Sequence, residues 1–238
     1  DNANFDFWPD TSELEADELF NTSMTYSNGQ PAKLYSAYKQ KTVVRHFKWM
    51  ADNNLDGVFF QRFLSDIGGG NILALRNQVA VNVRVGAETY GRAFAIMYDI
   101  SGYPTNTLVS KLTNDWLYLV NTQKVTNSPS YLHHRGKPVV AIWGFGVNGR
   151  SDVPQQAQQA IDWFKAAGCT VMGGLPTHWR TLNGDSQTNT AWNSVFRSFD
   201  VISPWSVGRY GNITEVDNFR VNQIVPDLAD CTTNRIDY

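Results

Sequence analysis

Five short, uninterrupted apolar runs constrain the fold of this chain more than any other feature. They occupy residues 57–62, 93–98, 138–143, 169–173 and 200–204. Strands that are buried on both faces have this continuous apolar character, whereas strands with one wet face alternate. The runs begin about 31 to 46 residues apart, which is typical of repeated strand–helix units. The pattern therefore predicts an α/β protein with a parallel sheet.

Helical periodicity fills the intervals between the runs. Apolar residues recur every three or four positions over residues 43–50, 75–87, 108–120 and 157–164. Asp152 as a cap and Pro154 mark the start of the fourth helix, and Gly168 marks its end. A last helix is predicted over residues 221–228, although Pro226 disfavours a helix interior. Roughly the first fifty residues lack a strand pattern, so we expect loop plus one helix there.

Two folds accept this order of elements, an open doubly wound sheet and a (β/α)₈ TIM-barrel-like fold. Gly68, Gly69 and Gly70 follow the first strand but do not complete the Gly-x-Gly-x-x-Gly fingerprint of a dinucleotide site. A flexible loop leading to Asn71 as a helix cap is the simpler interpretation. The five predicted strands fall short of the eight that a barrel needs. Residues 1–238 contain no linker and no repeat, so we expect a single barrel domain.

Charge and hydropathy exclude several classes of protein. The net charge is −2 and the calculated isoelectric point is about 6.1, which argues against a nucleic-acid or anionic-membrane partner. No apolar run approaches the roughly 20 residues that cross a bilayer. No signal peptide begins the chain, so any such segment has already been removed.

Cysteine usage and glycosylation motifs bear on the compartment. Cys169 and Cys231 are the two cysteines, too few for a disulfide scaffold. Cys169 lies in an apolar run and is interpreted as a buried free thiol, with a bridge to Cys231 as the alternative. Asn21 and Asn212 each begin an Asn-x-Ser/Thr sequon, so they are candidate glycosylation sites. The sequons favour a secreted glycoprotein.

Polar and aromatic side chains stand at the end of every predicted strand. They are Gln61 and Arg62, Tyr98 and Asp99, Trp143, then His178, Trp179 and Arg180, and finally Trp205, Arg209 and Tyr210. In a barrel these ends meet at one rim, where the chemistry of such folds is found. Aromatic rings stack on the apolar faces of sugars, and the charged groups bond hydroxyls. The chain is 13% aromatic, with 8 Trp and 10 Tyr, and we predict that these residues bind a glycan.

Structural interpretations of the same residues stay open. Trp143 and Trp205 could fill the top of the barrel, and Arg62 with Asp99 could form a buried ion pair. His178 could be a core histidine whose nitrogens are both bonded. The joint pattern over all five strand ends is stronger than any one member.

Other chemistries are poorly supported by the sequence. The four histidines, His46, His133, His134 and His178, do not have metal-ligand spacing with one another or with a cysteine. No Gly-x-Ser-x-Gly nucleophile motif is present, and no cofactor motif is complete. We therefore expect neither a metal nor a cofactor.

Glycoside hydrolysis normally uses two carboxyl groups. Only Asp99 follows a predicted strand directly, and it is our candidate catalytic residue. Asp56 and Asp200 lie at the opposite ends of their strands, where stabilising roles are expected. Glu215 and Asp217 are the next candidates for the second carboxylate.

Several segments together resemble one family group. They are residues 56–63 (DGVFFQRF), 97–102 (MYDISG), 136–144 (GKPVVAIWG), 176–180 (PTHWR) and 202–210 (ISPWSVGRY), with 6–10 (DFWPD) near the start. They are similar to segments of secreted (β/α)₈-barrel proteins related to glycoside hydrolase families 71 and 99, many of them described as xylosidase/arabinosidase. The match runs in order along nearly the whole chain. It is more specific for fold than for substrate.

The resemblance implies a barrel that acts on glycans and accounts for the missing strands. Relatives have a first strand with a Gly-Tyr-Gln-Gly-Trp-like segment and a late strand rich in acidic residues, and both are absent from this sequence. Family 99 enzymes take their catalytic glutamates from a late strand, so those residues cannot be carried over. The resemblance therefore indicates either a fragment or a shortened protein that keeps only binding.

Two functional hypotheses follow. The first is a secreted, endo-acting glycoside hydrolase, or a piece of one, that uses carboxylate acid/base chemistry. The alternative is a lectin-like barrel that binds carbohydrate without turnover. We expect an oligo- or polysaccharide partner, no nucleic acid, no membrane and a monomer. An RNA-binding or nuclease role is a weaker third option, which the acidic net charge disfavours.

Overall fold

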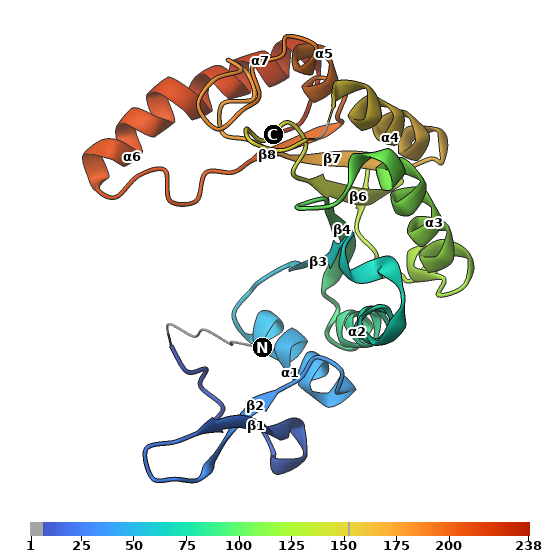
Figure 1. Ribbon diagram of the computed structural model, residues 1–238, viewed down its shortest axis with the longest axis vertical. Helices are drawn as coiled ribbons and strands as arrows, with labels where there is room; N and C mark the ends of the chain where they lie inside the picture. The colour runs from blue at the N-terminus through green and yellow to red at the C-terminus, as the bar shows by residue number, and fades with distance from the viewer. Residues whose placement is uncertain (1–6, 152) are drawn as a thin grey trace.

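The computed structural model describes residues 7–151 and 153–238, and its centre is a parallel β-sheet (Figure 1). The strands are β3 (Gly57–Phe63), β4 (Ala93–Asp99), β6 (Lys137–Trp143), β7 (Thr170–Leu175) and β8 (Val201–Pro204). They pair in the order β3-β4-β6-β7-β8, and every one of these contacts is parallel. All five predicted strands are confirmed. The predicted cap at Asp152 lies outside the described residues.

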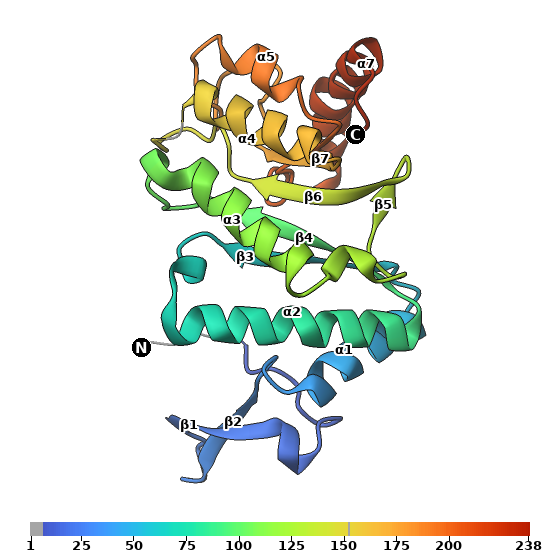
Figure 2. The same cartoon turned by 90° about the vertical axis from the view of Figure 1, so that its right-hand side faces the viewer.

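Three long helices lie along one face of the sheet, α2 (Gly70–Tyr90), α3 (Leu108–Asn121) and α4 (Pro154–Ala166) (Figure 2). Helix α1 (Gln40–Asp52) packs beside α2 (Figure 2). A doubly wound sheet carries helices on both faces, whereas a barrel carries them only outside. The chain thus has the (β/α)₈-like fold. Parallel strands alternate with helices along the chain, and the long helices lie on the outer face of the sheet.

The sheet is open in the part of the chain that the structure describes. One edge of β3 has no strand partner among these residues. Beyond β8, an isolated parallel bridge from Val201 to Asp237 continues the sheet by one residue. A short strand β5 (His133–His134) forms an antiparallel hairpin with the amino-terminal end of β6. This hairpin lies at the opposite end of the sheet from the carboxyl ends of the parallel strands.

The core lies between the sheet and the helix layer. Its fully buried side chains include Phe94, Ile96, Val140, Ile142, Leu112, Ile161 and Phe164. The strand residues are apolar without alternation because one face packs on helices and the other faces the barrel interior. Within the described residues, no helix is long and apolar enough to cross a membrane.

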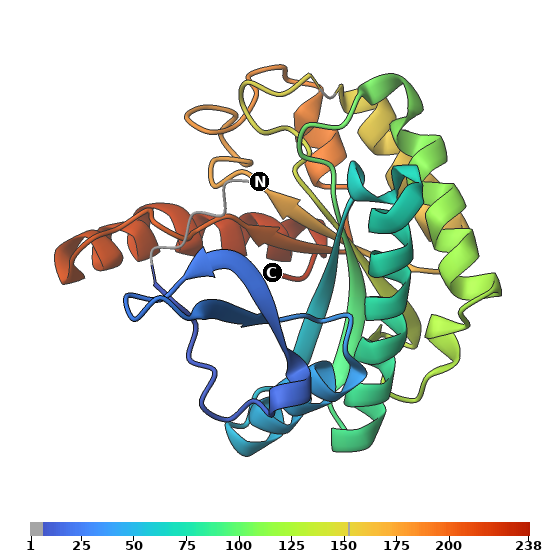
Figure 3. The same ribbon diagram turned by 60° about the horizontal axis from the view of Figure 1, so that its bottom comes forward.

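The N-terminal region contains a hairpin that the sequence analysis did not predict. Strands β1 (Leu19–Thr25) and β2 (Pro31–Tyr35) pair antiparallel, so the expectation of loop plus one helix was wrong (Figure 3). Both faces of the hairpin are largely exposed, so its sequence carries no continuous apolar run. The short 3₁₀ helix η1 (Ala16–Glu18) anchors it, because Arg45 on α1 donates to the buried Glu18 carboxylate at 2.6 Å.

The C-terminal helix is confirmed and has an unusual turn. Helix α6 (Ile213–Phe219) runs through a π-helical turn (Arg220–Ile224, η5) into α7 (Val225–Asn234). Pro226 falls just after the π-helical turn, an irregularity that allows a residue without an N–H inside a continuous helix. The shorter elements are α5 (Trp192–Phe196) and the 3₁₀ turns η2 (Asp66–Gly68), η3 (Thr105–Thr107) and η4 (Val125–Asn127).

Candidate functional site

The carboxyl ends of β4, β6, β7 and β8 surround a cavity of about 370 Å³, called the mouth cavity below. Its lining is Asp99, Ser101, Trp143, Gly144, Val147, Arg150, Gly174, Leu175, Pro176, Asp185, Trp205 and Arg209. The fold places these residues together because parallel strands end at one rim. Four of the residues predicted from the sequence line this cavity, namely Asp99, Trp143, Trp205 and Arg209.

Asp99 is held in place at the tip of β4. Its Oδ2 accepts a hydrogen bond from Gln61 Nε2 at 2.8 Å, and its Oδ1 accepts one from the Ser101 amide at 2.8 Å. Gln61 lies on the neighbouring strand β3. The predicted site residue Gln61 therefore acts through Asp99, by fixing the direction of the carboxylate.

Two indoles form an aromatic wall of the mouth cavity. The rings of Trp143 and Trp205 are 5.4 Å apart between centroids and nearly perpendicular, at 86°. Gly174 on β7 makes room for this arrangement, since a Cβ there would lie 2.1 Å from the Trp143 ring. Trp205 keeps 47% of its surface exposed. A large exposed ring at a concave rim is suited to stacking on a flat ligand.

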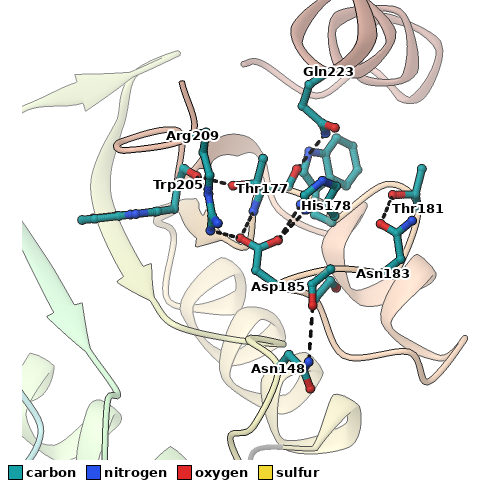
Figure 4. A network of polar contacts seen from close by, with 12 residues as sticks. Asn148, Thr177, His178, Thr181, Asn183, Asp185, Trp205, Arg209 and Gln223 are labelled. Atoms are coloured by element: carbon teal, nitrogen blue, oxygen red, sulfur yellow. Dashed lines mark hydrogen bonds and ion pairs between the residues drawn. The ribbon is translucent and has the colours of Figure 1, made fainter. Parts of the chain in front are cut away.

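The second carboxylate of the mouth cavity is Asp185, which the sequence analysis missed. It lies in the long loop after β7 and accepts hydrogen bonds from His178 Nδ1 at 2.8 Å, the Thr177 amide at 2.9 Å and the His178 amide at 3.0 Å (Figure 4). Arg209 completes the set with an ion pair to Oδ2. The only sequence signal was an Asp followed by Ser in a polar loop, which is too common to single out.

Electrostatics keep Asp185 ionised. Its partial burial acts to raise the pKa of the carboxyl. The hydrogen bonds from the His178 ring and from the Thr177 and His178 amides, with the Arg209 charge, outweigh that effect and lower the pKa below its ordinary value. Asp185 is therefore a carboxylate at neutral pH. The predicted site residue His178 does not line the mouth cavity, and its ring is bonded to the Asp185 carboxylate, which does.

The prediction that Arg62 and Tyr98 contact a ligand does not fit their positions. Both are fully buried on the side of the sheet that faces the helices. Arg62 donates to Asp115 of α3 from Nε at 2.9 Å and from Nη2 at 2.5 Å, and the Tyr98 hydroxyl donates to the same carboxylate at 2.9 Å. A buried ion pair thus exists, but its acid is Asp115 instead of Asp99. Burial, with the nearby Asp115 charge, raises the pKa of Tyr98 well above its ordinary value.

Trp179 and Arg180 are also turned away from the mouth cavity. The Trp179 indole is fully buried and its Nε1 donates to Asp227 of α7 at 3.2 Å, while Arg180 Nε donates to the same carboxylate at 2.9 Å. Burial raises the pKa of Asp227 in spite of these donors and of Gln223. These contacts dock the C-terminal helix onto the loop after β7, which is a structural role.

The remaining predicted residues lie on the surface, all but Asn21 in or beside α6. Tyr210 packs on Phe219 with ring centroids 5.4 Å apart and does not line the mouth cavity. Glu215 and Asp217 are exposed, and Glu215 accepts the Gly211 amide at 2.7 Å as part of the start of α6. They are therefore not the second carboxylate of the cavity. The sequon residue Asn212 caps α6 by accepting the Glu215 amide at 3.1 Å, and Asn21 is exposed on β1.

The described part of the chain contains no cluster of metal ligands and no reactive thiol. Over these residues no three His, Cys, Asp or Glu side chains gather as metal ligands would. Cys169 and Cys231 are both buried and unbridged. Burial raises the pKa of Cys169 to about 12 and that of Cys231 to about 11, so both stay protonated thiols.

Comparison with known proteins gives a match by fold and none by sequence. No protein-family model matches the chain, and no curated protein matches it. Among solved structures, the GH99 endo-alpha-mannosidase from Bacteroides thetaiotaomicron superposes with a TM-score of 0.55 at 11% identity. That alignment covers 93% of this chain and 66% of the mannosidase chain, so this chain spans just under two thirds of its length.

A second structure of that enzyme, in complex with bis-tris-propane, aligns with a TM-score of 0.35 at 13% identity over 73% of each chain. Identity this low carries the fold and no residue roles. What the comparisons show is that this chain shares its (β/α)₈-like fold with a GH99 endo-alpha-mannosidase.

Proposed function

We propose that the mouth cavity binds carbohydrate and that the chain is a glycan-acting protein of the glycoside hydrolase type. The observation that carries the proposal is one cavity in which an indole pair, with the Trp205 ring exposed, stands beside two carboxylates, Asp99 and Asp185. The shared fold with an endo-alpha-mannosidase is consistent with this function.

Each group of the mouth cavity has a defined task in this proposal. Trp205 stacks on the apolar face of a sugar ring, with Trp143 packed edge-on behind it. Asp99, aimed by Gln61, accepts a hydrogen bond from a sugar hydroxyl as a carboxylate or protonates the glycosidic oxygen as a carboxylic acid. Asp185 stays ionised, and this suits a base, a nucleophile or a group that stabilises positive charge on the sugar.

Binding without turnover is the second candidate, and one observation favours it. Asp185 is already engaged by Arg209, by the His178 ring and by two amides. A carboxylate held in this way is a weak participant in proton transfer, which leaves Asp99 as the single less engaged carboxyl of the cavity. A lectin-like site needs only the aromatic wall and hydrogen-bonding groups.

One experiment separates the two candidates. The purified chain is exposed to a panel of oligosaccharides, and binding and product release are measured on the same samples. Binding with release of products supports the hydrolase, and binding without release supports the lectin-like site. If no member of a broad panel binds or is cleaved, the carbohydrate proposal fails.

We also propose that the protein is secreted and glycosylated. Both sequon residues, Asn21 and Asn212, are exposed, as an acceptor must be. Peptide mass spectrometry of the protein from its natural source tests this proposal. Unmodified peptides at both positions would count against glycosylation.

A further inference from the structure

Arg150 and Asp99 are the two charged side chains of the mouth cavity that form no ion pair with any residue that the structure describes. Four charged side chains line that cavity, and the Asp185 carboxylate neutralises Arg209. Asp99 is bonded by neutral donors, Gln61 and the Ser101 amide. Arg150 forms no ion pair with any residue that the structure describes. Two neutral donors already hold the Asp99 carboxylate, whereas no opposite charge among the described residues is bonded to Arg150, so an anionic group of a ligand would find a charge-assisted partner there.

The Arg150 guanidinium is held in a defined position. Its Nη1 donates to the Gly144 carbonyl at 3.0 Å. A Cβ at Gly144 would lie 2.0 Å from that nitrogen, so the arginine occupies space that only glycine leaves free. Gly144 also has φ +111°, a conformation that favours glycine. With Nη1 anchored, Nε and Nη2 have no hydrogen-bond partner among the described residues.

Arg150 faces two neighbouring hollows. It lines the mouth cavity and also a second cavity of about 310 Å³ that contains Tyr103, Pro104 and Leu108. The second cavity has room for a further sugar ring beside the Tyr103 phenol. A group recognised by Arg150 would therefore lie at the junction between two rings of a bound glycan.

We propose that the preferred ligand is an anionic glycan, whose carboxylate or sulfate group pairs with Arg150. This inference rests on the proposed function and adds the class of sugar. A guanidinium presents parallel N–H groups that match the two oxygens of a carboxylate or sulfate. Arg150 is partly buried, so solvent and salt screen such a contact less than one on the open surface. Asp99 stays available for a hydroxyl.

The test compares matched glycans and matched variants by calorimetry. The probes are neutral oligosaccharides, the corresponding uronate-containing oligosaccharides and the corresponding sulfated ones, at low and at moderate salt. The variants are Arg150→Gln and Arg150→Lys. Arg92→Gln is the control, since Arg92 also donates to main-chain carbonyls and forms no ion pair among the described residues. Thermal melting of each variant confirms that it is folded.

We expect at least one anionic series to bind roughly tenfold more tightly than its neutral counterpart. Arg150→Gln should reduce that affinity to the neutral level, Arg150→Lys should retain part of it, and Arg92→Gln should change nothing. Comparison of the uronate and sulfate series identifies which anion is recognised.

Two outcomes overturn the inference, and they differ from failure of the proposed function. Neutral glycans that bind as tightly as anionic ones would show that Arg150 recognises no charge. A preference for anionic glycans that survives Arg150→Gln would place the recognition elsewhere. If no glycan of any series binds, the proposed function itself fails.

Discussion

The carboxylate of Asp185 and the guanidinium of Arg209 form an ion pair that joins the loop after β7 to the loop after β8. Trp205 begins the second of these loops, and the Thr177 hydroxyl donates to its carbonyl. The exposed Trp205 indole directly follows the end of β8, and contacts between the two loops hold it in position.

Asp185→Asn should loosen this arrangement. The variant keeps the shape of the side chain but loses the charge that pairs with Arg209, and it replaces one acceptor oxygen by an NH₂ group that faces N–H donors, at a cost of about 1–3 kcal/mol. We expect faster hydrogen exchange over residues 205–211 and weaker glycan binding. Exchange mass spectrometry measures the first and calorimetry the second, and unchanged exchange in that loop would refute the positioning role.

Acid should weaken the same contact. The pKa of Asp185 is lowered on folding from an ordinary value of 3.8, so its contribution to stability is complete above that value. The contribution is lost as pH falls through the lower, folded-state pKa. The wild type should therefore lose more stability than Asp185→Asn between pH 4 and acid unfolding, as thermal melts would report. Identical acid profiles for the two proteins would contradict this prediction.

The charge on the Glu18 carboxylate contributes more to folding stability than the charge on Asp185 does, and its contribution is likewise lost as pH falls. Hydrogen bonds from Arg45 lower the pKa of this buried carboxyl from 4.5 to about 2, against the opposing effect of burial. The stability that it supplies is present above about pH 4.5 and is lost as pH falls toward 2. Glu18→Gln should cost about 2 kcal/mol at pH 7, measured by urea unfolding. The exposed Glu13→Gln is the control, and equal effects of the two changes would argue against the anchor.

Arg62 and Asp115 should behave as a structural pair. Replacing either partner alone leaves a buried charge uncompensated, so Arg62→Met and Asp115→Leu should each cost about 3–5 kcal/mol in unfolding free energy. The double variant should cost clearly less than the sum of the two. Additive effects in this double-mutant cycle would mean that the two side chains do not interact.

Asp99→Asn tests the role of the first carboxyl. The change should abolish any hydrolysis of the oligosaccharide panel and leave the melting temperature nearly unchanged, because the contacts of Asp99 lie at the rim. Asp217→Asn, at an exposed position, is the matched control. A large drop in melting temperature would instead make Asp99 a structural residue.

The sequence predicted the sheet because burial on both faces leaves an unmistakable apolar run. It missed the β1–β2 hairpin, whose faces are largely exposed and which contacts with α1 hold in place, among them Arg45 with Glu18 and His46 with Tyr35. Whether such a segment forms a strand depends on packing against residues distant in the sequence, and the local sequence pattern carries no information about that packing.

At the site, the position of a residue at a strand end predicted that it lies near the carboxyl edge of the sheet. It did not predict which face of the sheet the side chain is on. Successive residues of a strand point to opposite sides, so Gln61 and Arg62 cannot both face the cavity, and neither can Tyr98 and Asp99. The structure turns Gln61 and Asp99 toward the mouth and buries Arg62 and Tyr98 under the helices. Asp185 was out of reach, because it lies ten residues beyond Leu175, the end of β7, in a loop whose path only the fold reveals.

Calorimetric titration of Trp205→Ala with a glycan that binds the wild type tests the central claim most directly. Trp8→Ala is the control, since Trp8 also belongs to an edge-to-face aromatic pair, with Tyr26, and does not line the cavity. If the mouth cavity is the carbohydrate site, Trp205→Ala lowers the affinity about tenfold or more, while Trp8→Ala and both melting temperatures stay near the wild type. Undiminished binding by a folded Trp205→Ala protein would contradict the account.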